Sequence, residues 1–430
     1  MTRQRGSGRT AGVLAAAVCM AAVLLPGGAW AAGEDGSYGF DGTAQRVKGA
    51  VSNLDAEQLK AGQSYRDSIK TNGKQYYRVD LDTKQNAYVS VVAVPKGAAK
   101  ASYGDGIKVS MQDGSGTDCG YQTTTFGSSA FTRPIAAYTH RTIEPGSSSC
   151  QQAGAYYVLV ERTSESDTAD WDLEIRYLTE PGVKKTGPTA LPDNWASGTP
   201  QPPAGGPQRR DGGTGLAGAT SLRQGEWRTD IKPGQTVFYR VPVDWGQQLF
   251  ASAELGSSPA SDDYVGNALV LSLENRAGGH VDRQDSMSYD GDPATTALDP
   301  QRPVAFENRF SSDDSTSALR FAGWYYLSAT LNPEIAEAYG NKPLPLTLRV
   351  NVTGQAKPGP AYDGAAGPFT VTEDDRDAAA SGQSGPQATR SGTLRVVGVT
   401  GIGVGTVLVL GLGAWWLLAR RAAGSGPTPG

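Results

Sequence analysis

The sequence predicts an all-β protein that consists of two antiparallel β-sandwich modules and one C-terminal transmembrane helix. Three observations support this fold class. Apolar and polar residues alternate with a period of two in many short segments, as is typical of half-buried strands. A set of these segments occurs twice, at a spacing of about 162 residues, as from Tyr65 to Trp227. An uncharged apolar segment near the C-terminus is long enough to cross a bilayer.

Residues 1–31 have the features of a secretory signal peptide. Several arginines give a positively charged start, and an apolar run follows from residue 11 to residue 25. Small residues then favour cleavage after Ala31. The alternative is an uncleaved membrane anchor, but so short an apolar run before a small-residue site favours cleavage.

Strands are predicted in both modules, for example at residues 76–81, 88–92 and 269–273, where apolar and polar side chains alternate. We expect one face of each strand to lie on a core and the other to lie in water. Clusters of Gly, Asn, Asp and Pro separate the strands, which favours antiparallel sandwiches over parallel sheets with helical crossovers. In the second module a short helix is expected around residues 333–339.

The modules are predicted to be copies of one unit, because several segments match in the same order. The matched pairs are 59–81 with 222–243, 154–160 with 323–329, and 171–177 with 344–352. We therefore place module 1 at residues 51–180 and module 2 at residues 216–354.

Two segments outside the modules are predicted to lack a fixed fold. Residues 181–215 are rich in Pro, Gly and Thr, so a flexible linker is expected there. Residues 355–393 are rich in Gly, Ala and Asp, and they contain the acidic run 373–375. This composition favours a disordered stalk that lifts the modules off the membrane.

The apolar segment 396–419 is predicted to be a transmembrane helix. At ~1.5 Å per residue it would extend about 36 Å, enough for a hydrocarbon core of about 30 Å. Arg420 and Arg421 follow it directly. The positive-inside rule places the tail, residues 420–430, in the cytoplasm and the N-terminal bulk outside, as a single-pass type I protein of the cytoplasmic membrane. A cleaved sorting signal would look similar, but the sequence before this segment has no LPxTG-type motif.

Glycine spacing in this segment raises the question of self-association. Gly401 and Gly405 lie four residues apart, a spacing that lets two helices approach closely. It would support a weak homodimer through the transmembrane helix. The alternative is a monomeric tether, because glycine is frequent in transmembrane helices generally.

Composition and cysteine usage narrow the class of protein further. A net charge of −4 and a pI near 5.4 argue against nucleic acid as a partner. Cys119 and Cys150 remain after removal of the signal peptide, which contains Cys19. An even pair in an exported chain predicts one disulfide. A metal pair or a reactive thiol is the alternative.

The order of the motifs in each module resembles the bacterial pre-peptidase C-terminal family, which implies jelly-roll-like β-sandwiches of the kind appended to secreted enzymes. The repeated segments given above carry this resemblance. Module 2, the stalk and the anchor together also resemble the C-terminal half of membrane-anchored actinomycete surface proteins, through residues 238–250, 321–327 and 411–415. Those proteins often carry a von Willebrand factor A domain, for which this chain has no room between Ala32 and Val51.

Residues for catalysis do not stand out. His140 and His280 are the two histidines of the chain, one in each module, and both are expected in polar surface loops. A catalytic triad needs a base beside its nucleophile, and the sequence holds no nucleophile-elbow, zincin or P-loop motif. We therefore predict a protein that is not an enzyme, with no catalytic residues, no cofactor and no metal ligands.

Two acidic segments are candidates for metal sites. Residues 113–118 are superficially similar to the D-x-S-x-S metal site of von Willebrand A domains, but a β-turn leading into Cys119 is the better interpretation. Asp290, Asp292 and Asp299, with the pair at 262–263, could supply oxygen ligands to calcium. Solvated acidic loops are the commoner explanation.

Tryptophans give a second candidate for ligand binding. Trp227, Trp245 and Trp324 could form a carbohydrate-stacking face, or they could be core residues, as large aromatics in strands usually are.

The sequence as a whole predicts a membrane-tethered binding or scaffold protein of the cell surface that engages envelope polymers or an exported protein. The alternative is an accessory subunit of an exported peptidase or of a secretion machinery.

Overall fold

The computed structural model describes residues 37–390, except 97–99, 145, 166, 194 and 260–262, together with residues 410 and 412–418. The predicted signal peptide with its cleavage at Ala31 lies outside the described residues, as do Arg420 and Arg421. Gly401, Gly405 and most of the predicted transmembrane segment lie outside them as well. Within the described part of the chain, no helix has the length and apolar character needed to span a membrane.

Module 1 is a β-sandwich of two five-stranded sheets. Sheet 1A has the strand order β1-β3-β10-β5-β8, and sheet 1B has the order β2-β4-β9-β6-β7. The strands are β1 (Gln45–Arg46), β2 (Glu57–Gln58), β3 (Ser64–Ile69), β4 (Lys74–Leu81), β5 (Asn86–Val94), β6 (Gly106–Gln112), β7 (Asp118–Thr125), β8 (Ile135–Arg141), β9 (Gly154–Thr163) and β10 (Trp171–Glu180).

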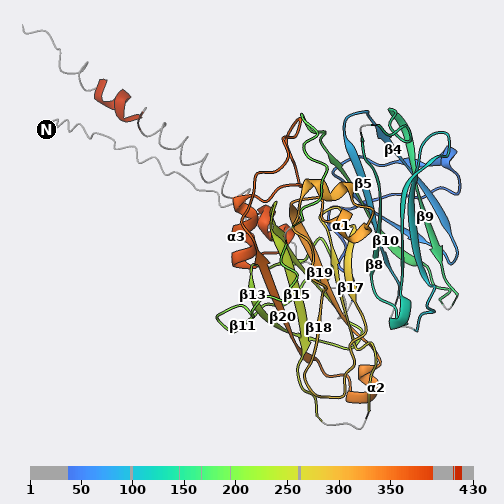
Figure 1. Cartoon of the computed structure of the whole chain (residues 1–430), viewed down its shortest axis with the longest axis vertical. Coiled ribbons are helices and arrows are strands. Elements are labelled where there is room, and N and C mark those ends of the chain that lie inside the picture. The colour runs from blue at the N-terminus through green and yellow to red at the C-terminus, as the bar shows by residue number, and fades with distance from the viewer. Residues whose placement is uncertain are drawn as a thin grey trace, which may run out of the picture. The chain divides into compact units, whose positions relative to one another are not determined.

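Module 2 repeats this arrangement. Sheet 2A has the order β11-β13-β20-β15-β18, and sheet 2B has the order β12-β14-β19-β16-β17. The strands are β11 (Pro207–Arg209), β12 (Thr220–Ser221), β13 (Gly225–Ile231), β14 (Thr236–Val243), β15 (Gln248–Leu255), β16 (Leu269–Glu274), β17 (His280–Gln284), β18 (Ala294–Ala297), β19 (Gly323–Leu331) and β20 (Leu344–Thr353) (Figure 1).

The two strand orders become identical when ten is added to each strand number of module 1. The predicted duplication is therefore visible in the topology as well as in the sequence. The pairing is antiparallel except at the short first strands, where β1 and β2 pair parallel to β3 and β4, as β11 and β12 do to β13 and β14. The predicted all-β sandwich architecture is confirmed.

The alternation within β4 shows why this sequence forms a sandwich. Tyr77, Val79 and Leu81 are buried between the two sheets of module 1, while Arg78 and Asp80 between them are exposed. In module 2 the equivalent strand, β14, places Val237, Tyr239, Val241 and Val243 in the core. Each fully buried apolar side chain of this size stabilises the fold by roughly 1.5–3 kcal/mol.

Short helices lie between or after the strands. They include the 3-10 helices η1 (Asn53–Asp55), η2 (Gly127–Ser129) and η3 (Phe306–Phe310), and the α-helices α1 (Asp314–Ala318), α2 (Ile335–Tyr339) and α3 (Glu373–Ser381). The helix expected around residues 333–339 is confirmed as α2. The sequence prediction missed α1, which begins after Asp313, whose side chain accepts a hydrogen bond from the Thr316 amide.

The segment predicted as a disordered stalk differs from that expectation within residues 355–390. The helix α3 begins with a capping box in which Thr372 and Asp375 satisfy each other's backbone amides. Its Ala378 and Ala379 are buried against sheet 2B, and Phe369 before it is also buried. Low hydrophobicity favours disorder in isolation, but here a few small apolar side chains find a preformed sheet face to cover.

The segment predicted as a flexible linker also has fixed contacts. The strand β11 within it pairs with β13, and Val183 bridges to Tyr362. Ala196 exchanges hydrogen bonds with the Gln248 side chain. The segment therefore runs along module 2 and adds a strand to it.

Candidate functional site

The outer face of sheet 1A packs against the outer face of sheet 2B, and we call this contact the seam. Val92 of β5 belongs to the same buried cluster as Phe238 of β14 and Tyr326 of β19. At one edge of the seam β8 lies beside β17 (Figure 1). The strand β5 is therefore buried on both faces, and the prediction that residues 88–92 have one face in water was wrong.

Glu180, the last residue of β10, is the centre of the polar contacts in the seam. Its Oε2 accepts hydrogen bonds from Asn86 Nδ2 at 2.7 Å and from Tyr88 Oη at 2.8 Å. Its Oε1 accepts from Arg309 Nη2 at 3.1 Å and from Tyr362 Oη at 2.8 Å. One buried carboxylate thus binds module 1, module 2 and the C-terminal segment together.

A second polar group in the seam is the phenol of Tyr326. Arg276 Nη1 donates to its oxygen at 2.8 Å, and the Arg176 guanidinium of module 1 lies 5.7 Å from its ring centroid. Burial acts to raise the pKa of Tyr326, but Arg276, Arg176 and Arg240 outweigh burial and lower the pKa to about 7. The seam therefore contains an ionisable group whose state matters near neutral pH.

The duplication relates sheet 2B, which carries module 2's half of the seam, to sheet 1B of module 1. Tyr76 and Arg78 are the third and fifth residues of β4, and Phe238 and Arg240 are the third and fifth of β14. Tyr157 is the fourth residue of β9, as Tyr326 is of β19. The ladders agree, because Arg78 pairs with Tyr157 and Arg240 pairs with Tyr326.

The outer face of sheet 1B carries a row of side chains across four strands. Tyr76 pairs with Leu159, Leu159 with Ser110, and Ser110 with Tyr121. Leu159 and Ser110 are buried in the middle of this row, Tyr76 is half-buried and Tyr121 is 65 % exposed, whereas Phe238 in module 2 is buried in the seam. The aromatic side chains of this face are therefore covered in module 2 and partly open to solvent in module 1. We call the outer face of sheet 1B, with the turn at residues 51–54, the tyrosine face.

Two aliphatic side chains stand at the rim of the tyrosine face. Val51 is 88 % exposed and Leu54 is 89 % exposed, next to Ala50, which bridges to Tyr76. The corresponding turn of module 2 follows Gly213, which bridges to Phe238, and there Leu216 is buried. Exposed aliphatic residues in a turn whose duplicate contains a buried leucine indicate a contact surface.

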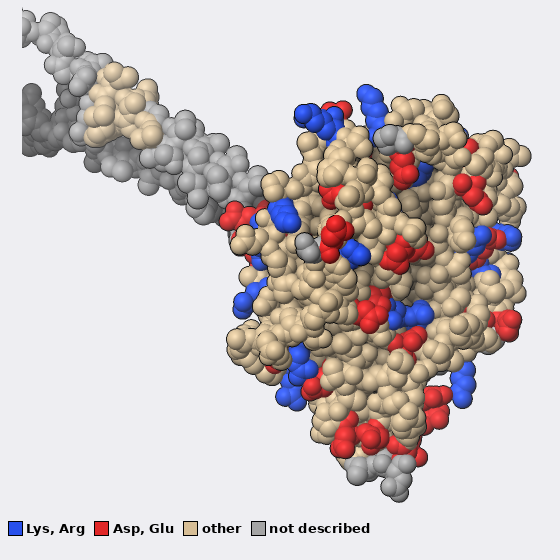
Figure 2. Space-filling view, viewed as in Figure 1, with Lys and Arg blue, Asp and Glu red and all other residues tan. Residues whose placement is uncertain are grey.

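Charges on the tyrosine face balance each other. Lys74 pairs with Glu161 at 2.6 Å, and Arg78 pairs with Asp80 at 2.8 Å. Lys108 Nζ lies 4.6 Å above the ring of Tyr121. Acidic and basic side chains are likewise interspersed over the view of the molecule in Figure 2. The tyrosine face therefore does not select for a strongly charged partner.

The outer face of sheet 2A has a different character. Glu254 occupies on β15 the position that Val92 occupies on β5, counted from the first residue of each strand. Arg349 reaches Glu254 at 2.9 Å and Glu226 at 3.1 Å across this face. The apolar row that sheet 1A uses in the seam is thus replaced by ion pairs on sheet 2A.

The predicted disulfide is confirmed, with Cys119 bonded to Cys150 within module 1. The acidic segment before it forms a turn, in which Asp113 Oδ1 accepts from Ser115 Oγ and from the amides of Ser115 and Thr117. These hydrogen bonds, that from Ser115 Oγ first, lower the pKa of Asp113. The turn predicted for residues 113–118 is confirmed.

The two histidines are not in polar surface loops, so that prediction was wrong. His140 lies on β8, stacked on Tyr138 at 5.3 Å between ring centroids, and His280 begins β17. Burial lowers the pKa of His140 to about 3 and that of His280 to about 4, with Arg320 and Arg283 adding to the two shifts. Both imidazoles are therefore neutral at physiological pH.

The tryptophans predicted as an alternative glycan platform are buried, so they form no exposed platform. Trp227 and Trp245 belong to the core of module 2, and Trp324 lies in the seam, where its Nε1 donates to Asp375 Oδ1 at 2.8 Å. Tyr76 of β4 and Tyr157 of β9, which belong to the tyrosine face, were not predicted as binding residues. The repeat could have indicated them, because they align with Phe238 and Tyr326 of module 2.

The acidic residues considered for calcium do not converge on a site. Asp290 Oδ1 accepts from the Asp292 amide, while the Asp299 amide donates to Asp282. Within residues 37–390, apart from the gaps given above, no three His, Cys, Asp or Glu side chains are grouped so as to hold a metal ion. Asp262 lies outside the described residues.

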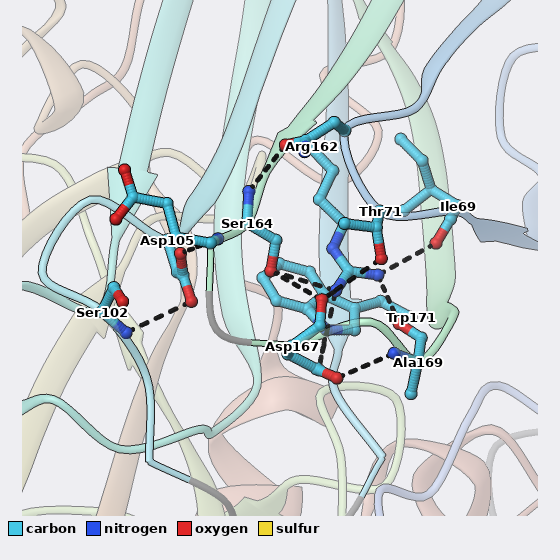
Figure 3. Close-up of polar contacts among 11 residues, drawn as sticks. Ile69, Thr71, Ser102, Asp105, Arg162, Ser164, Asp167, Ala169 and Trp171 are labelled. Carbon is cyan, nitrogen blue, oxygen red and sulfur yellow. Dashed lines mark hydrogen bonds and ion pairs between the residues drawn. The ribbon is translucent and has the colours of Figure 1, made fainter.

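Arg162 is a buried arginine of module 1, and its contacts are structural. Arg162 donates to the carbonyl of Ala169 at 2.5 Å and to that of Asp167 at 2.7 Å, and its guanidinium lies 3.8 Å from the centroid of the Trp171 ring (Figure 3). The Asp167 carboxylate accepts from Trp171 Nε1 at 2.6 Å. These bonds fix the loop between β9 and β10.

A cavity of about 660 Å³ opens beside Glu180, where both modules and the C-terminal segment meet. Two of its polar side chains are engaged within the protein: Asp82 accepts from the amides of Lys84 and Gln85, and Arg309 bonds Glu180. The tyrosine face is the better candidate for binding, because its duplicate in module 2 is covered by protein side chains.

Comparisons with known proteins leave the family open. No protein-family model matches the sequence, and no curated protein matches it. Among solved structures, tripeptidyl peptidase 2 is 8 % identical over 68 % of this chain and 24 % of its own, with a TM-score of 0.21. The tandem CBM22 domain of Paenibacillus barcinonensis Xyn10C is 12 % identical over 75 % of this chain and 95 % of its own, with a TM-score of 0.17.

A third similar structure is the tandem CBM51 modules of the family 98 glycoside hydrolase from Streptococcus pneumoniae SP3-BS71. It is 9 % identical over 69 % of this chain and 85 % of its own, with a TM-score of 0.19. Similarities this low carry no argument about activity or ligand.

Proposed function

We propose that this chain is a binding protein of the cell surface, tethered to the cytoplasmic membrane by residues 396–419, which engages an envelope polymer or another exported protein through the tyrosine face. The observation that carries the proposal is the contrast between two equivalent faces. Phe238, Arg240 and Tyr326 are buried in the seam, while their counterparts Tyr76, Arg78 and Tyr157 remain accessible.

The residues of the tyrosine face suit binding. Tyrosine and arginine are enriched where proteins make specific contacts, because they combine apolar area with a polar end. The strands that carry Tyr76 and Tyr157 are held by the core of module 1, so their side chains are presented on a fixed support.

Three features support a location of this chain outside the cell: the predicted signal peptide, the apolar segment 396–419 and the disulfide Cys119–Cys150. Disulfides persist in oxidising compartments. The resemblance to pre-peptidase C-terminal modules, with jelly-roll-like sandwiches, agrees with an exported protein.

The proposal is tested in living cells with the full-length chain. A photoreactive phenylalanine derivative replaces Tyr76 or Tyr157, and in a matched control it replaces Tyr264, a tyrosine of module 2 that is 69 % exposed. Irradiation is expected to give covalent adducts from positions 76 and 157 and none from position 264. Equal yields at all three positions, or no adduct from positions 76 and 157, would contradict the proposal.

A further inference from the structure

We infer that the occupant of the tyrosine face is a protein that docks with an apolar β-sheet face carrying an arginine, rather than a polysaccharide or a second copy of this chain. This inference rests on the proposed function, and it names the partner class for the same surface. The seam provides the argument, because it shows how the duplicate of this surface is covered.

The side chains of sheet 1A that cover sheet 2B are apolar residues and an arginine. Sheet 1A supplies Val92, with Val94 and Ala136 packed at its margin, so small apolar side chains lie against Phe238 and Tyr326. Arg176 of sheet 1A stacks on Tyr326. A partner for the tyrosine face is expected to present the same kind of row, with an arginine placed to stack on Tyr157.

The rim of the surface also favours a protein over a polysaccharide. Val51 and Leu54 are aliphatic and almost fully exposed. In module 2 the corresponding turn is covered by apolar protein side chains, Tyr38 of the N-terminal segment and Ala378 and Ala379 of α3. Aliphatic side chains gain free energy by burial against other apolar groups, whereas the hydroxyl-rich surface of a sugar offers little of this.

Differences between the two faces indicate a reversible contact. Tyr76 stands where module 2 has Phe238, and Lys108 stands where module 2 has Val270, counted along the paired strands. Permanent interfaces are more apolar than reversible ones. The tyrosine face is more polar than its buried duplicate, so its partner binds and leaves.

A second copy of this chain does not offer the complementary surface. The surface that fits sheet 2B is the outer face of sheet 1A, and in every copy this face is already buried in the seam. Its duplicate, sheet 2A, has Glu254 where sheet 1A has Val92, and Arg349 is paired with Glu226 and Glu254. A copy that approached with sheet 2A would bury these ions against Leu159 and Tyr157, which is unfavourable.

The photocrosslinking system of the proposed function separates the outcomes. The adduct formed from position 157 is digested either with protease or with muramidase, and it is also formed in the variant Val51→Glu with Leu54→Glu. We expect an adduct that protease destroys, that muramidase leaves intact, and that maps to a β-strand of a different protein. The rim variant is expected to reduce its yield at least about tenfold, because a protein contact extends over the rim.

Each other result overturns the inference. An adduct that resists protease and is shortened by muramidase assigns the face to a polysaccharide. An adduct with a second copy of this chain assigns it to self-association. A yield unchanged by the rim variant removes the extended protein contact. Lack of any adduct from positions 76 and 157 contradicts the proposed function itself, and so differs from these three. Leu54→Ala with Val51→Ala, which keeps the turn uncharged, checks that the glutamates do not act by unfolding it.

Discussion

Glu180 of module 1 and Arg309 of module 2 form an ion pair of 3.1 Å across the seam, with side chains that are 0 % and 7 % exposed. The carboxylate also accepts hydrogen bonds from Tyr88 and Tyr362. Burial of two charges is costly unless further hydrogen bonds satisfy them, and here Glu180 has such bonds. The pair therefore joins module 1 to module 2 at Glu180, the residue directly before the segment 181–215 that connects the two modules.

Removal of this carboxylate should destabilise the protein strongly. In Glu180→Ala the Arg309 guanidinium is left buried without its counter-ion, which costs about 3–5 kcal/mol in comparable buried pairs. Urea denaturation of residues 37–390 measures the loss as a lower free energy of unfolding. Asp230→Asn is the matched control, because it removes an exposed ion pair with Arg209 and should cost less than about 1 kcal/mol. Equal effects of the two substitutions would contradict a structural role of Glu180.

The turn before β17 offers a way to loosen the seam without a change of charge. A Cβ atom added at Gly279 would lie 2.7 Å from Tyr138 Cζ of module 1 and 2.9 Å from Asn275 Nδ2. Gly279→Val should therefore push the modules apart, and limited proteolysis should cleave residues 181–206 faster. Gly104→Val is the control, since a Cβ there meets nothing within 4 Å. Unchanged cleavage of Gly279→Val would show that this turn does not hold the seam.

Much of the fold could be predicted from the sequence, because local patterns determine it. The alternation of Tyr77, Val79 and Leu81 follows from one face on a core, and the duplicated motifs gave the same ten-strand order twice. Cys119 and Cys150 were the one pair left after processing. These patterns do not depend on which side chains pack against the outer face of a sheet, so they can be recognised in the sequence alone.

The seam could not be derived in the same way, although parts of it left a trace. The strand β5 contains Tyr88 and Val92 among other apolar residues, and such a nearly continuous apolar run indicates burial on both faces. Glu180 has no such trace, since its partners come from residues 86, 88, 309 and 362, which are distant in sequence. The helix α3 was missed because alanines covering a sheet add little hydrophobicity to their segment.

Loss of the disulfide should lower stability by an amount set by its loop. The bond joins residues 31 positions apart, and the chain-entropy model gives about 3–4 kcal/mol for a loop of this length. Cys119→Ser with Cys150→Ser should therefore lower the free energy of unfolding by this amount in urea. Reductant should lower the wild-type value to that of the variant and leave the variant unchanged. A reductant effect on the variant would mean that the disulfide is not its target.

Tyr326 should make the stability of the protein depend on pH. Arg276, Arg176 and Arg240 lower its pKa from 10.0 to about 7, so the folded state releases this proton at a lower pH than the unfolded state. The unfolded state then binds more protons between pH 7 and pH 10, and stability rises with pH across this window. The contribution is on the order of a few kcal/mol at pH 10, and it is lost as the pH falls through 7.

A substitution isolates this contribution from other groups in the seam. Burial raises the pKa of Glu274, which pairs with Tyr326 in the ladder, from 4.5 to about 8. Glu274 therefore makes the stability of the protein fall as the pH rises from 4.5 to 8. The difference between wild type and Tyr326→Phe cancels Glu274, because both proteins contain it. That difference should grow from pH 7 to pH 10, and ultraviolet absorbance should show one tyrosinate forming near pH 7 in the wild type alone. A tyrosinate that forms near pH 10 in both proteins would show that the three arginines do not ionise Tyr326.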